Sequence, residues 1–275
     1  MQRKIGACSW ILGSASDQQI AEGWQAAGLD GVEYNPSRYG NDASDTKKTF
    51  ADHGLSVFSL TPPDADLSSP DKSIRKVAVD TYYWLIDFAR AVGSPIVSCH
   101  GQVGRIAPIT SQAEEDQHLL ESVDVITKRA KESGINVVFE VLNRYETHQI
   151  RTSREAVDLV TKINQPNLSV LLDSYHMNIE ETNSVDAIHF AGKHLGLYHI
   201  ADSNREAPGH GHINFASQLK ALDSINYQDP IILEINAPGP NPFSPDKGLG
   251  FRENVISQLS EGVAFLNTYA REQAA

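Results

Sequence analysis

Residues 137–146 read VVFEVLNRYE, an apolar run that leads directly to a carboxylate at Glu140. Its first residues predict a short buried strand, because β-branched and aromatic side chains favour strands. Three later apolar runs also end on a side chain that can bind a cation: LSVLLD at Asp173, LGLYH at His199 and PIILE at Glu234. The intervals of 33, 26 and 35 residues each suit one strand and one helix. A parallel barrel brings all its strand ends to one face, so we expect these four side chains to converge.

Short β-rich runs alternate with longer amphipathic runs along the whole chain. We predict strands at Ile5–Trp10, Gly31–Tyr34, Ser56–Leu60, Ile96–Cys99, Asn136–Glu140, Ser169–Asp173, Leu197–Ile200 and Ile231–Ile235. Helical spacing of apolar residues predicts helices at Ser73–Val92, Glu114–Ser133, Thr152–Ile163 and Glu253–Arg271, with Ser153 as a candidate N-cap of the third. This alternation predicts an α/β fold, a (β/α)8 TIM barrel that forms one domain over residues 1–275. A doubly wound open sheet is the rival, but no G-x-G-x-x-G motif follows the first strand.

Composition narrows the classes of function. The chain has 275 residues, of which 40% are hydrophobic and 21% charged, and a net charge of -12. An acidic chain is a poor nonspecific binder of nucleic acid, which needs a cationic surface. Cys8 and Cys99 stand apart in apolar segments, so we expect reduced thiols and a cytoplasmic protein. The first ten residues lack a long apolar run, so we expect neither a signal peptide nor a membrane span.

The four strand-end side chains suggest a metal site. For any one of the carboxylates, a helix cap or a salt bridge is the simpler role. Four such residues in successive strand–helix units favour a shared divalent cation instead. Oxygen ligands with one imidazole suit Mn²⁺ or Mg²⁺, with Co²⁺ as a further candidate, whereas Zn²⁺ usually has more nitrogen or sulfur ligands. Such a centre stabilises an enediolate, and epimerisation then needs an acid/base group on each face of the carbon.

Several motifs of the second half resemble a known family. Glu140–Glu146 (EVLNRYE), Asp173–Glu180 (DSYHMNIE), and His199–Arg205 (HIADSNR) followed by Pro208–Gly211 (PGHG) are similar to motifs of the D-tagatose/D-psicose 3-epimerases. Glu234 stands where that family has its last metal-binding glutamate. The family is a ketose 3-epimerase branch of the xylose-isomerase-like TIM-barrel superfamily of sugar isomerases and epimerases.

The resemblance implies a role for each matching residue. The metal, usually Mn²⁺, would be held by Glu140, Asp173, His199 and Glu234. Glu140 and Glu234 would also be the acid/base pair on opposite faces of C3 of a free ketose, acting through a cis-enediolate. The substrate would be bound near C1–C3 by Glu146, His176 and Arg205. The resemblance further implies a small-molecule sugar substrate and a homo-oligomer, a dimer or a tetramer.

Some of these side chains also have simpler interpretations. His176 fits a core position after its strand, and Arg205 fits a salt bridge with Glu206. We predict that Arg144 orders its loop rather than contacting substrate. His100, directly after the fourth strand, would point to the active face and is a candidate substrate contact.

Other segments leave alternatives open. Trp10 fits either an apolar wall for a sugar or ordinary packing. The loop Ala237–Gly250, rich in proline and glycine, would lie over the active face, either as a lid or as an irregular surface loop.

The N-terminal half matches the epimerase pattern poorly, so neighbouring activities stay open. They are isomerisation of a keto-inositol or hydroxypyruvate, and elimination from a 3-keto C-glycoside as a deglycosidase subunit. An endonuclease IV-type nuclease is a further alternative, which the net charge of -12 disfavours. The last alternative is a barrel without catalytic activity, which binds a sugar or serves as the partner subunit of another chain.

Overall fold

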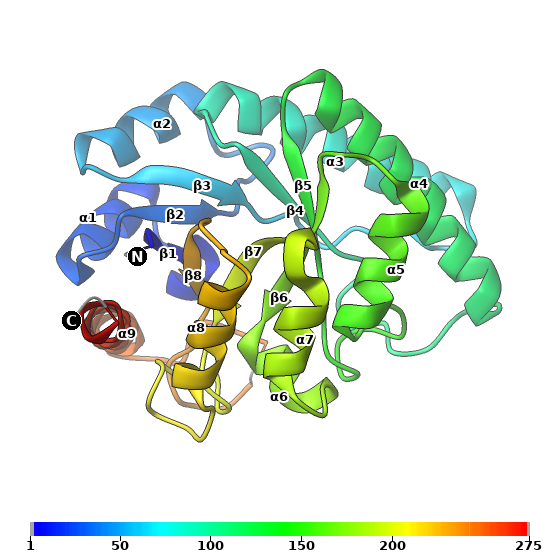
Figure 1. Ribbon diagram of the computed structural model, residues 1–275. Coiled ribbons are helices and arrows are strands. Elements are labelled where there is room, and N and C mark those ends of the chain that lie inside the picture. Colours follow the sequence, from blue (N-terminus) through cyan, green and yellow to red (C-terminus); the bar gives the residue numbers. More distant parts are fainter. Residues whose placement is uncertain (1–2, 242, 274–275) are drawn as a thin grey trace.

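Pairing of β1 with β8 closes the sheet of this protein into a barrel (Figure 1). The computed structural model describes residues 3–241 and 243–273. Every strand is parallel to its neighbours, and at the closure Ile5 lies opposite Ile231 and Ala7 opposite Leu233. The strands are β1 (Ile5–Cys8), β2 (Gly31–Tyr34), β3 (Ser56–Leu60), β4 (Ile96–Cys99), β5 (Asn136–Glu140), β6 (Leu168–Asp173), β7 (Leu195–Ile200) and β8 (Ile231–Leu233). The predicted (β/α)8 barrel is confirmed, and an open doubly wound sheet is excluded.

Four strands, β2 to β5, have the predicted bounds, whereas the first and last strands are shorter than predicted. β1 ends at Cys8 rather than Trp10, because Ser9–Leu12 turns into a 3₁₀-helix, η1. β8 ends at Leu233 rather than Ile235. Glu234 therefore follows its strand by one residue, although its backbone N–H still donates to Ile200 of β7 over 3.1 Å.

Helices follow the strands and pack on the outside of the barrel. They are α1 (Asp17–Ala27), α2 (Ala43–Asp52), α3 (Lys72–Val92), α4 (Gln112–Glu132), α5 (Ser153–Ile163), α6 (Ser174–Glu180), α7 (Ser184–Ala191), α8 (Phe215–Ser224) and α9 (Phe251–Glu272), with a second 3₁₀-helix, η2 (Gly192–His194), before β7. The four predicted helices are present, each within two residues of its expected bounds. Among the helices of residues 3–241 and 243–273, none is long and apolar enough to cross a membrane.

The start of α5 differs from the prediction by one residue. Thr152, not Ser153, is the N-cap: its hydroxyl accepts from the backbone N–H of Glu155, and the Glu155 carboxylate accepts from the backbone N–H of Thr152 over 2.9 Å. This reciprocal capping box needs a hydroxyl three residues before a glutamate, a spacing that only Thr152 has. Ser153 is instead the first helical residue, and its backbone N–H donates to Glu181.

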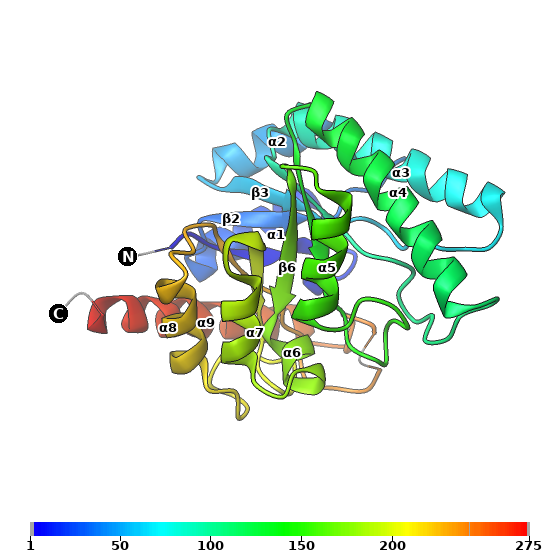
Figure 2. The ribbon, with the colours of Figure 1, turned by 45° about the vertical axis from the view of Figure 1, so that its right-hand side comes forward.

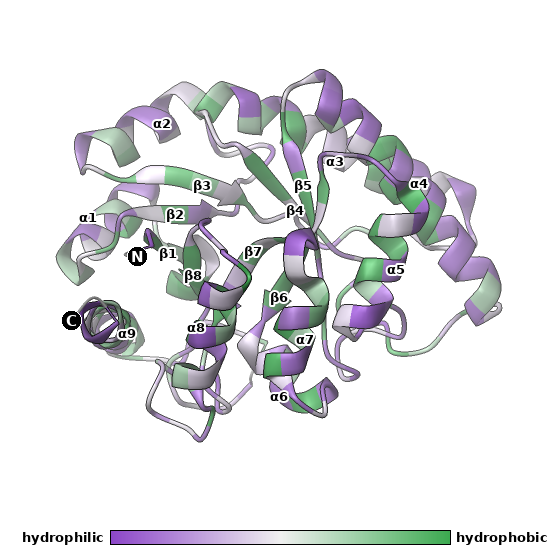
Figure 3. Cartoon of the chain, in the orientation of Figure 1, coloured by the Kyte–Doolittle hydropathy of each residue, from purple (hydrophilic) through white to green (hydrophobic). Residues whose placement is uncertain are grey.

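The helices form a layer around the barrel, and α9 packs against α1 beside the β1–β8 closure (Figures 1 and 2). Each helix carries both hydrophobic and hydrophilic residues along its length, as expected for helices with one face on the barrel and one toward solvent (Figure 3).

The interior of the barrel is apolar and tightly filled at the end where the strands begin. A Cβ atom on Gly31 would lie 2.3 Å from the backbone oxygen of Ser56 and 2.6 Å from the Phe58 ring, and one on Gly6 would lie 2.9 Å from the same ring. These two glycines therefore allow the Phe58 ring to lie against the strands. Because this end is filled, the polar site occupies the other end, where the strands terminate.

Candidate metal centre and active site

Four acidic and imidazole side chains converge at the carboxyl ends of β5 to β8. Glu140 ends β5, Asp173 ends β6, His199 lies in β7 and Glu234 follows β8. One ligand atom from each lies within 4.8 Å of those of the other three, and all four side chains are buried. The predicted convergence is confirmed. Three carboxylates and one imidazole form a donor set that fits a hard divalent cation.

His199 is the centre of this group. Its Nδ1 lies 2.8 Å from Oε2 of Glu234 and 3.6 Å from Oε1 of Glu140. Burial disfavours the charged imidazole, but the carboxylates of Glu33 and Glu234 outweigh burial and raise the pKa of His199 well above its usual value. The site therefore concentrates negative charge around one ring.

Arg205 supplies the cation beside this group. Its Nη1 lies 2.6 Å from Oδ2 of Asp173, and its Nη2 lies 2.9 Å from Oε2 of Glu234. The guanidinium also lies over the ring of Tyr175, 4.6 Å from the ring centre. The interpretation of Arg205 as a salt bridge with Glu206 is wrong, because its carboxylate partners are the two in the cluster.

The pKa values of the cluster carboxylates are shifted in different directions. Burial opposes the charge on Asp173, yet the Arg205 guanidinium holds its pKa well below the usual range. Burial also opposes the charge on Glu140, but the hydrogen bond and charge of His199 lower its pKa. For Glu234 burial prevails over Arg205 and His199, and its pKa is raised.

A cavity of about 740 Å³ opens beside the cluster at the strand ends. This volume is in the range of small-molecule sites, about 300–1,000 Å³. Both glutamates of the predicted acid/base pair and all the predicted substrate residues line it: Glu140, Glu234, Glu146, His176, Arg205 and His100. Trp10 also lines the cavity, from η1 rather than from β1.

The loop after β5 connects two of these residues. Asn143 donates from Nδ2 to Oε1 of Glu146 over 2.9 Å, and its backbone N–H donates to Nδ1 of His176 over 3.2 Å. Asn143 therefore orients both candidate substrate residues, a role that the sequence did not indicate. His176 is buried, as the core interpretation required, yet it also lines the cavity.

The same loop is fixed from outside the cavity. Arg144 pairs with Glu180 of α6, with its Nε 2.8 Å from Oε1 and its Nη2 3.0 Å from Oε2. Its backbone N–H donates to the same carboxylate. This pairing agrees with the prediction that Arg144 orders the loop.

His100 is held by Tyr82 of α3 and by the next residue, Gly101. Its backbone N–H donates to the hydroxyl of Tyr82 over 3.2 Å, and its Nδ1 lies 2.6 Å from the carbonyl oxygen of Gly101. The ring is buried at the cavity wall, on the active face where it was predicted.

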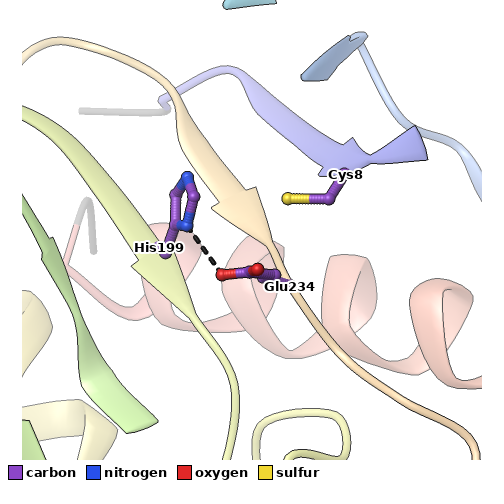
Figure 4. Close-up of side chains that lie close together, drawn as sticks. All are labelled: Cys8, His199 and Glu234. Carbon is purple, nitrogen blue, oxygen red and sulfur yellow. Dashed lines mark hydrogen bonds and ion pairs between the residues drawn. The ribbon is translucent and has the colours of Figure 1, made fainter. Parts of the chain in front are cut away.

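Both cysteines are free and buried. Cys8 lies close to the metal-ligand candidates: its thiol, the imidazole of His199 and the carboxylate of Glu234 face one another (Figure 4). Burial, with the nearby Glu33 and Glu234 carboxylates, raises the pKa of the Cys8 thiol well above its usual value.

The loop Ala237–Gly250 lies at the mouth of the cavity. Ala237, Pro238, Gly239, Phe243 and Lys247 are among the lining residues. The predicted position over the active face is confirmed. Residue 242, which belongs to this loop, lies outside the described residues.

Comparisons with known proteins agree with this geometry. Residues 24–265 match the family model for the xylose isomerase-like TIM barrel. Over 257 residues the chain is 32% identical to a ketose 3-epimerase of Arthrobacter globiformis, which covers 90% of this chain and 87% of that relative. The chain belongs to the ketose 3-epimerase family. It is thus an enzyme of the isomerase class.

Other members of the family are similar along most of their length. An L-ribulose 3-epimerase of Mesorhizobium japonicum is 30% identical over 244 residues, 84% of this chain and 80% of that protein. A crystal structure of D-psicose 3-epimerase with D-tagatose, from Clostridium cellulolyticum H10, superposes with a TM-score of 0.86 at 25% identity. That superposition covers 97% of this chain and 99% of that one.

Proposed function

We propose that this protein is a divalent-metal-dependent ketose 3-epimerase, which interconverts C3 epimers of a free ketose through a cis-enediolate. One observation carries the proposal: the Glu140–Asp173–His199–Glu234 cluster opens, through its two glutamates, into a cavity also lined by Glu146, His176 and Arg205. Membership of the ketose 3-epimerase family supports the same reaction.

The donor set supports a hard metal, with Mn²⁺ the expected ion and Mg²⁺ or Co²⁺ as alternatives. Glu140, Asp173, His199 and Glu234 would hold it. When bound, such a cation polarises the carbonyl and hydroxyl oxygens of the substrate and stabilises the negative charge of the enediolate.

The two glutamates would move the proton at C3. In one direction the Glu140 carboxylate takes the C3 proton, the C2 carbonyl oxygen gains the negative charge, and a C2–C3 double bond forms. The Glu234 carboxylic acid then returns a proton to C3 on the opposite face, which restores the carbonyl and inverts the carbon. In the other direction the two residues exchange roles, as epimerisation requires an acid/base group on each face.

The remaining cavity residues would orient the substrate. Glu146 and His176 form a polar pair fixed by Asn143, and Arg205 presents a cation beside the cluster. They suit hydrogen bonds to the hydroxyl groups near C1–C3, with His100 as a further contact on the wall. Both cationic Lys and Arg side chains that line the cavity in the described part of the chain already have partners: Arg205 pairs with Asp173 and Glu234, and Lys247 donates to the backbone carbonyls of its own loop. This favours an unphosphorylated sugar.

Two other features weigh against the nuclease alternative. The net charge is -12, and the four-residue cluster holds one histidine, whereas that alternative needs several and a basic face. Cytoplasmic location and homo-oligomer formation stay predictions from the sequence.

Proton exchange in D₂O tests the proposal. The protein is loaded with Mn²⁺ and its metal content is measured. It is then incubated in D₂O with a panel of ketopentoses and ketohexoses. Samples are taken over time, the metal is removed from them, and the C3–H signal is measured by NMR. We expect deuterium at C3 together with a new epimer, and the ranking of sugars identifies the substrate. A lack of exchange on every free ketose, in protein shown to hold metal, would contradict the proposal. The same assay on keto-inositols, phosphorylated ketoses and 3-keto glycosides would then separate the neighbouring activities.

Variants at the acid/base residues sharpen this test. Glu140→Gln is expected to abolish exchange at C3 even when metal is bound. Arg144→Ala is the matched control, because Arg144 pairs with Glu180 rather than with the cluster. Full turnover in Glu140→Gln with metal bound would rule out Glu140 as an acid/base group.

A further inference from the structure

A fourth buried carboxylate, that of Glu33, lies at the ring nitrogen of His199 that points away from Glu140 and Glu234. Glu33 of β2 has its Oε1 3.2 Å and its Oε2 3.3 Å from Nε2 of His199. The other ring nitrogen, Nδ1, faces Glu234 and Glu140. The ring therefore lies between Glu33 at one nitrogen and the pair Glu234 and Glu140 at the other.

Glu33 is itself held in place by its neighbours. The hydroxyl of Ser59 donates to its Oε2, the hydroxyl of Thr61 to its Oε1 over 2.6 Å, and the thiol of Cys8 lies 3.7 Å from Oε1. These three residues come from β1, from β3 and from the position after β3. The carboxylate cannot rotate without losing these bonds, so its orientation toward His199 is fixed.

An irregularity in the sheet creates this arrangement. Val32 pairs with Val57, but the next residue, Glu33, pairs with Ser59 rather than Phe58. A shift of one residue changes which side chains share a face of the sheet. It therefore places the Glu33 carboxylate beside the Ser59 hydroxyl, inside the barrel.

We propose that Glu33 is a positioning residue for the metal centre, which acts through His199. Its carboxylate accepts the Nε2–H of His199, and this fixes the tautomer in which the Nδ1 lone pair is directed at the site enclosed by Glu140 and Glu234. Carboxylates that accept from a metal-binding histidine orient the ring and increase its basicity. This inference rests on the proposed metal-binding role of His199.

Glu33 does not line the cavity, so its effect on the substrate would be indirect. The cavity-lining residues in the described part of the chain include Glu140 and Glu234 but not Glu33. Its loss should therefore weaken metal binding first and change turnover only through the metal. A purely structural role would lower stability without changing the affinity for metal.

Calorimetric titration of the apoprotein with Mn²⁺ separates these roles. We expect the Kd for Mn²⁺ to rise about 10- to 100-fold in Glu33→Ala, the usual effect of removing such a partner. Glu33→Gln keeps an acceptor for Nε2–H without the charge, so we expect a smaller rise. Saturating Mn²⁺ should restore much of the turnover in both variants.

Glu115 provides a matched control in the same barrel. It is a buried glutamate that also faces a histidine, with its Oε2 3.0 Å from Nε2 of His148, and it pairs with Arg105. Glu115→Gln should lower stability and leave the Kd for Mn²⁺ unchanged. An equal rise of Kd in both glutamate variants would show a general effect of losing a buried carboxylate and would overturn the proposal.

The tautomer of His199 gives a second readout that needs no Glu33 variant. In wild-type protein loaded with diamagnetic Zn²⁺, long-range ¹H–¹⁵N NMR spectra should show a protonated Nε2 and a metal-bound Nδ1 for His199, assigned by comparison with His199→Asn. A metal-bound Nε2 would overturn the inference even if the Glu33 variants fail to fold.

The outcomes also distinguish this inference from the proposed function. If wild-type protein binds no divalent cation, the metal-dependent function fails and this inference fails with it. If wild-type protein binds Mn²⁺ and epimerises a ketose, while Glu33→Ala binds Mn²⁺ with the same Kd, only the role of Glu33 is contradicted.

Discussion

Arg205 donates from Nη1 to Oδ2 of Asp173 over 2.6 Å. The other carboxylate oxygen of Asp173, Oδ1, accepts from the backbone N–H of Tyr175 over 2.6 Å and caps α6. From the sequence, a helix cap and a metal-site carboxylate were alternative roles for this residue. In the structure one oxygen atom caps the helix and the other faces Arg205 and the cluster, because the strand end and the helix start are the same position.

This division predicts different effects for two substitutions of Asp173. Both Asp173→Asn and Asp173→Ala should lose Mn²⁺ affinity strongly, because both remove the carboxylate charge. Asn retains an oxygen that caps α6, whereas Ala does not, and such a cap contributes about 1 kcal/mol. Urea unfolding should therefore show Asp173→Asn to be more stable than Asp173→Ala by about that amount. Equal stability of the two variants would show that the cap contributes nothing.

Catalysis should need the planar guanidinium of Arg205 and not only its positive charge. A lysine retains the charge but cannot bridge two carboxylates with a planar fork. We expect Arg205→Lys to bind Mn²⁺ with a similar stoichiometry and to lose about 10- to 100-fold in kcat/KM on the ketose that shows exchange, the equivalent of about 1.5–3 kcal/mol for a charged hydrogen bond. Steady-state kinetics with measured metal content check this, and an unchanged kcat/KM would argue against a substrate role.

Arg144 should tolerate substitution, because its side chain pairs with Glu180 at the surface. The Arg144 side chain is more than half exposed, so water screens its attraction to Glu180, and the backbone N–H of residue 144 would still donate to that carboxylate in a variant. We expect Arg144→Ala to change the urea midpoint of unfolding only slightly and to retain most of its kcat/KM. A loss of kcat/KM as large as that expected for Arg205→Lys would mean that Arg144 contacts the reacting end of the substrate.

Protonation of Asp202 at low pH should lower the stability that this residue gives to the loop after β7. Burial opposes the charge of Asp202, but the backbone N–H groups of Ser203, Ile213 and Gly209 donate to it, and its pKa is lowered from the usual 3.8. Because the folded pKa lies below the unfolded one, this contribution to stability is fully present above the unfolded value. It is lost as the pH falls through the folded pKa.

Urea unfolding at pH 6 down to pH 3 measures this effect. Wild-type protein should lose stability toward pH 3, and Asp202→Asn should lose less over the same range. Other carboxylates contribute to the acid limb of both proteins, so the difference between the two curves is the quantity to compare. Parallel curves would show that Asp202 does not contribute.

Much of the fold could be predicted from the sequence, because the strands of this barrel are short apolar runs with polar residues at one end. Asn136–Glu140 is such a strand, and its observed bounds are the predicted ones. The convergence of Glu140 with Asp173, His199 and Glu234 followed from parallel strand order alone, since all parallel strands of a closed barrel end on one face.

The residues that support the site could not be predicted in the same way. Glu33 joins His199 because the β2–β3 register shifts by one residue, and no sequence motif marks that shift. Asn143 stood in a recognised motif, but its contacts depend on how the loop after β5 folds toward α6. For Thr152 a signal was present: the hydroxyl three residues before Glu155 marks the cap more specifically than Ser153 does.

The closure of β1 onto β8 bears on how the protein is made. Ile5 and Ile231, which lie side by side in the barrel, are separated by most of the chain, so this contact has a high cost in loop-closure entropy. During synthesis β1 has an unpaired edge until residues 231–233 leave the ribosome, and an exposed edge is prone to wrong pairing. Glu234 emerges directly after the closing strand. The complete Glu140–Asp173–His199–Glu234 cluster therefore becomes available only when the strand that closes the barrel does.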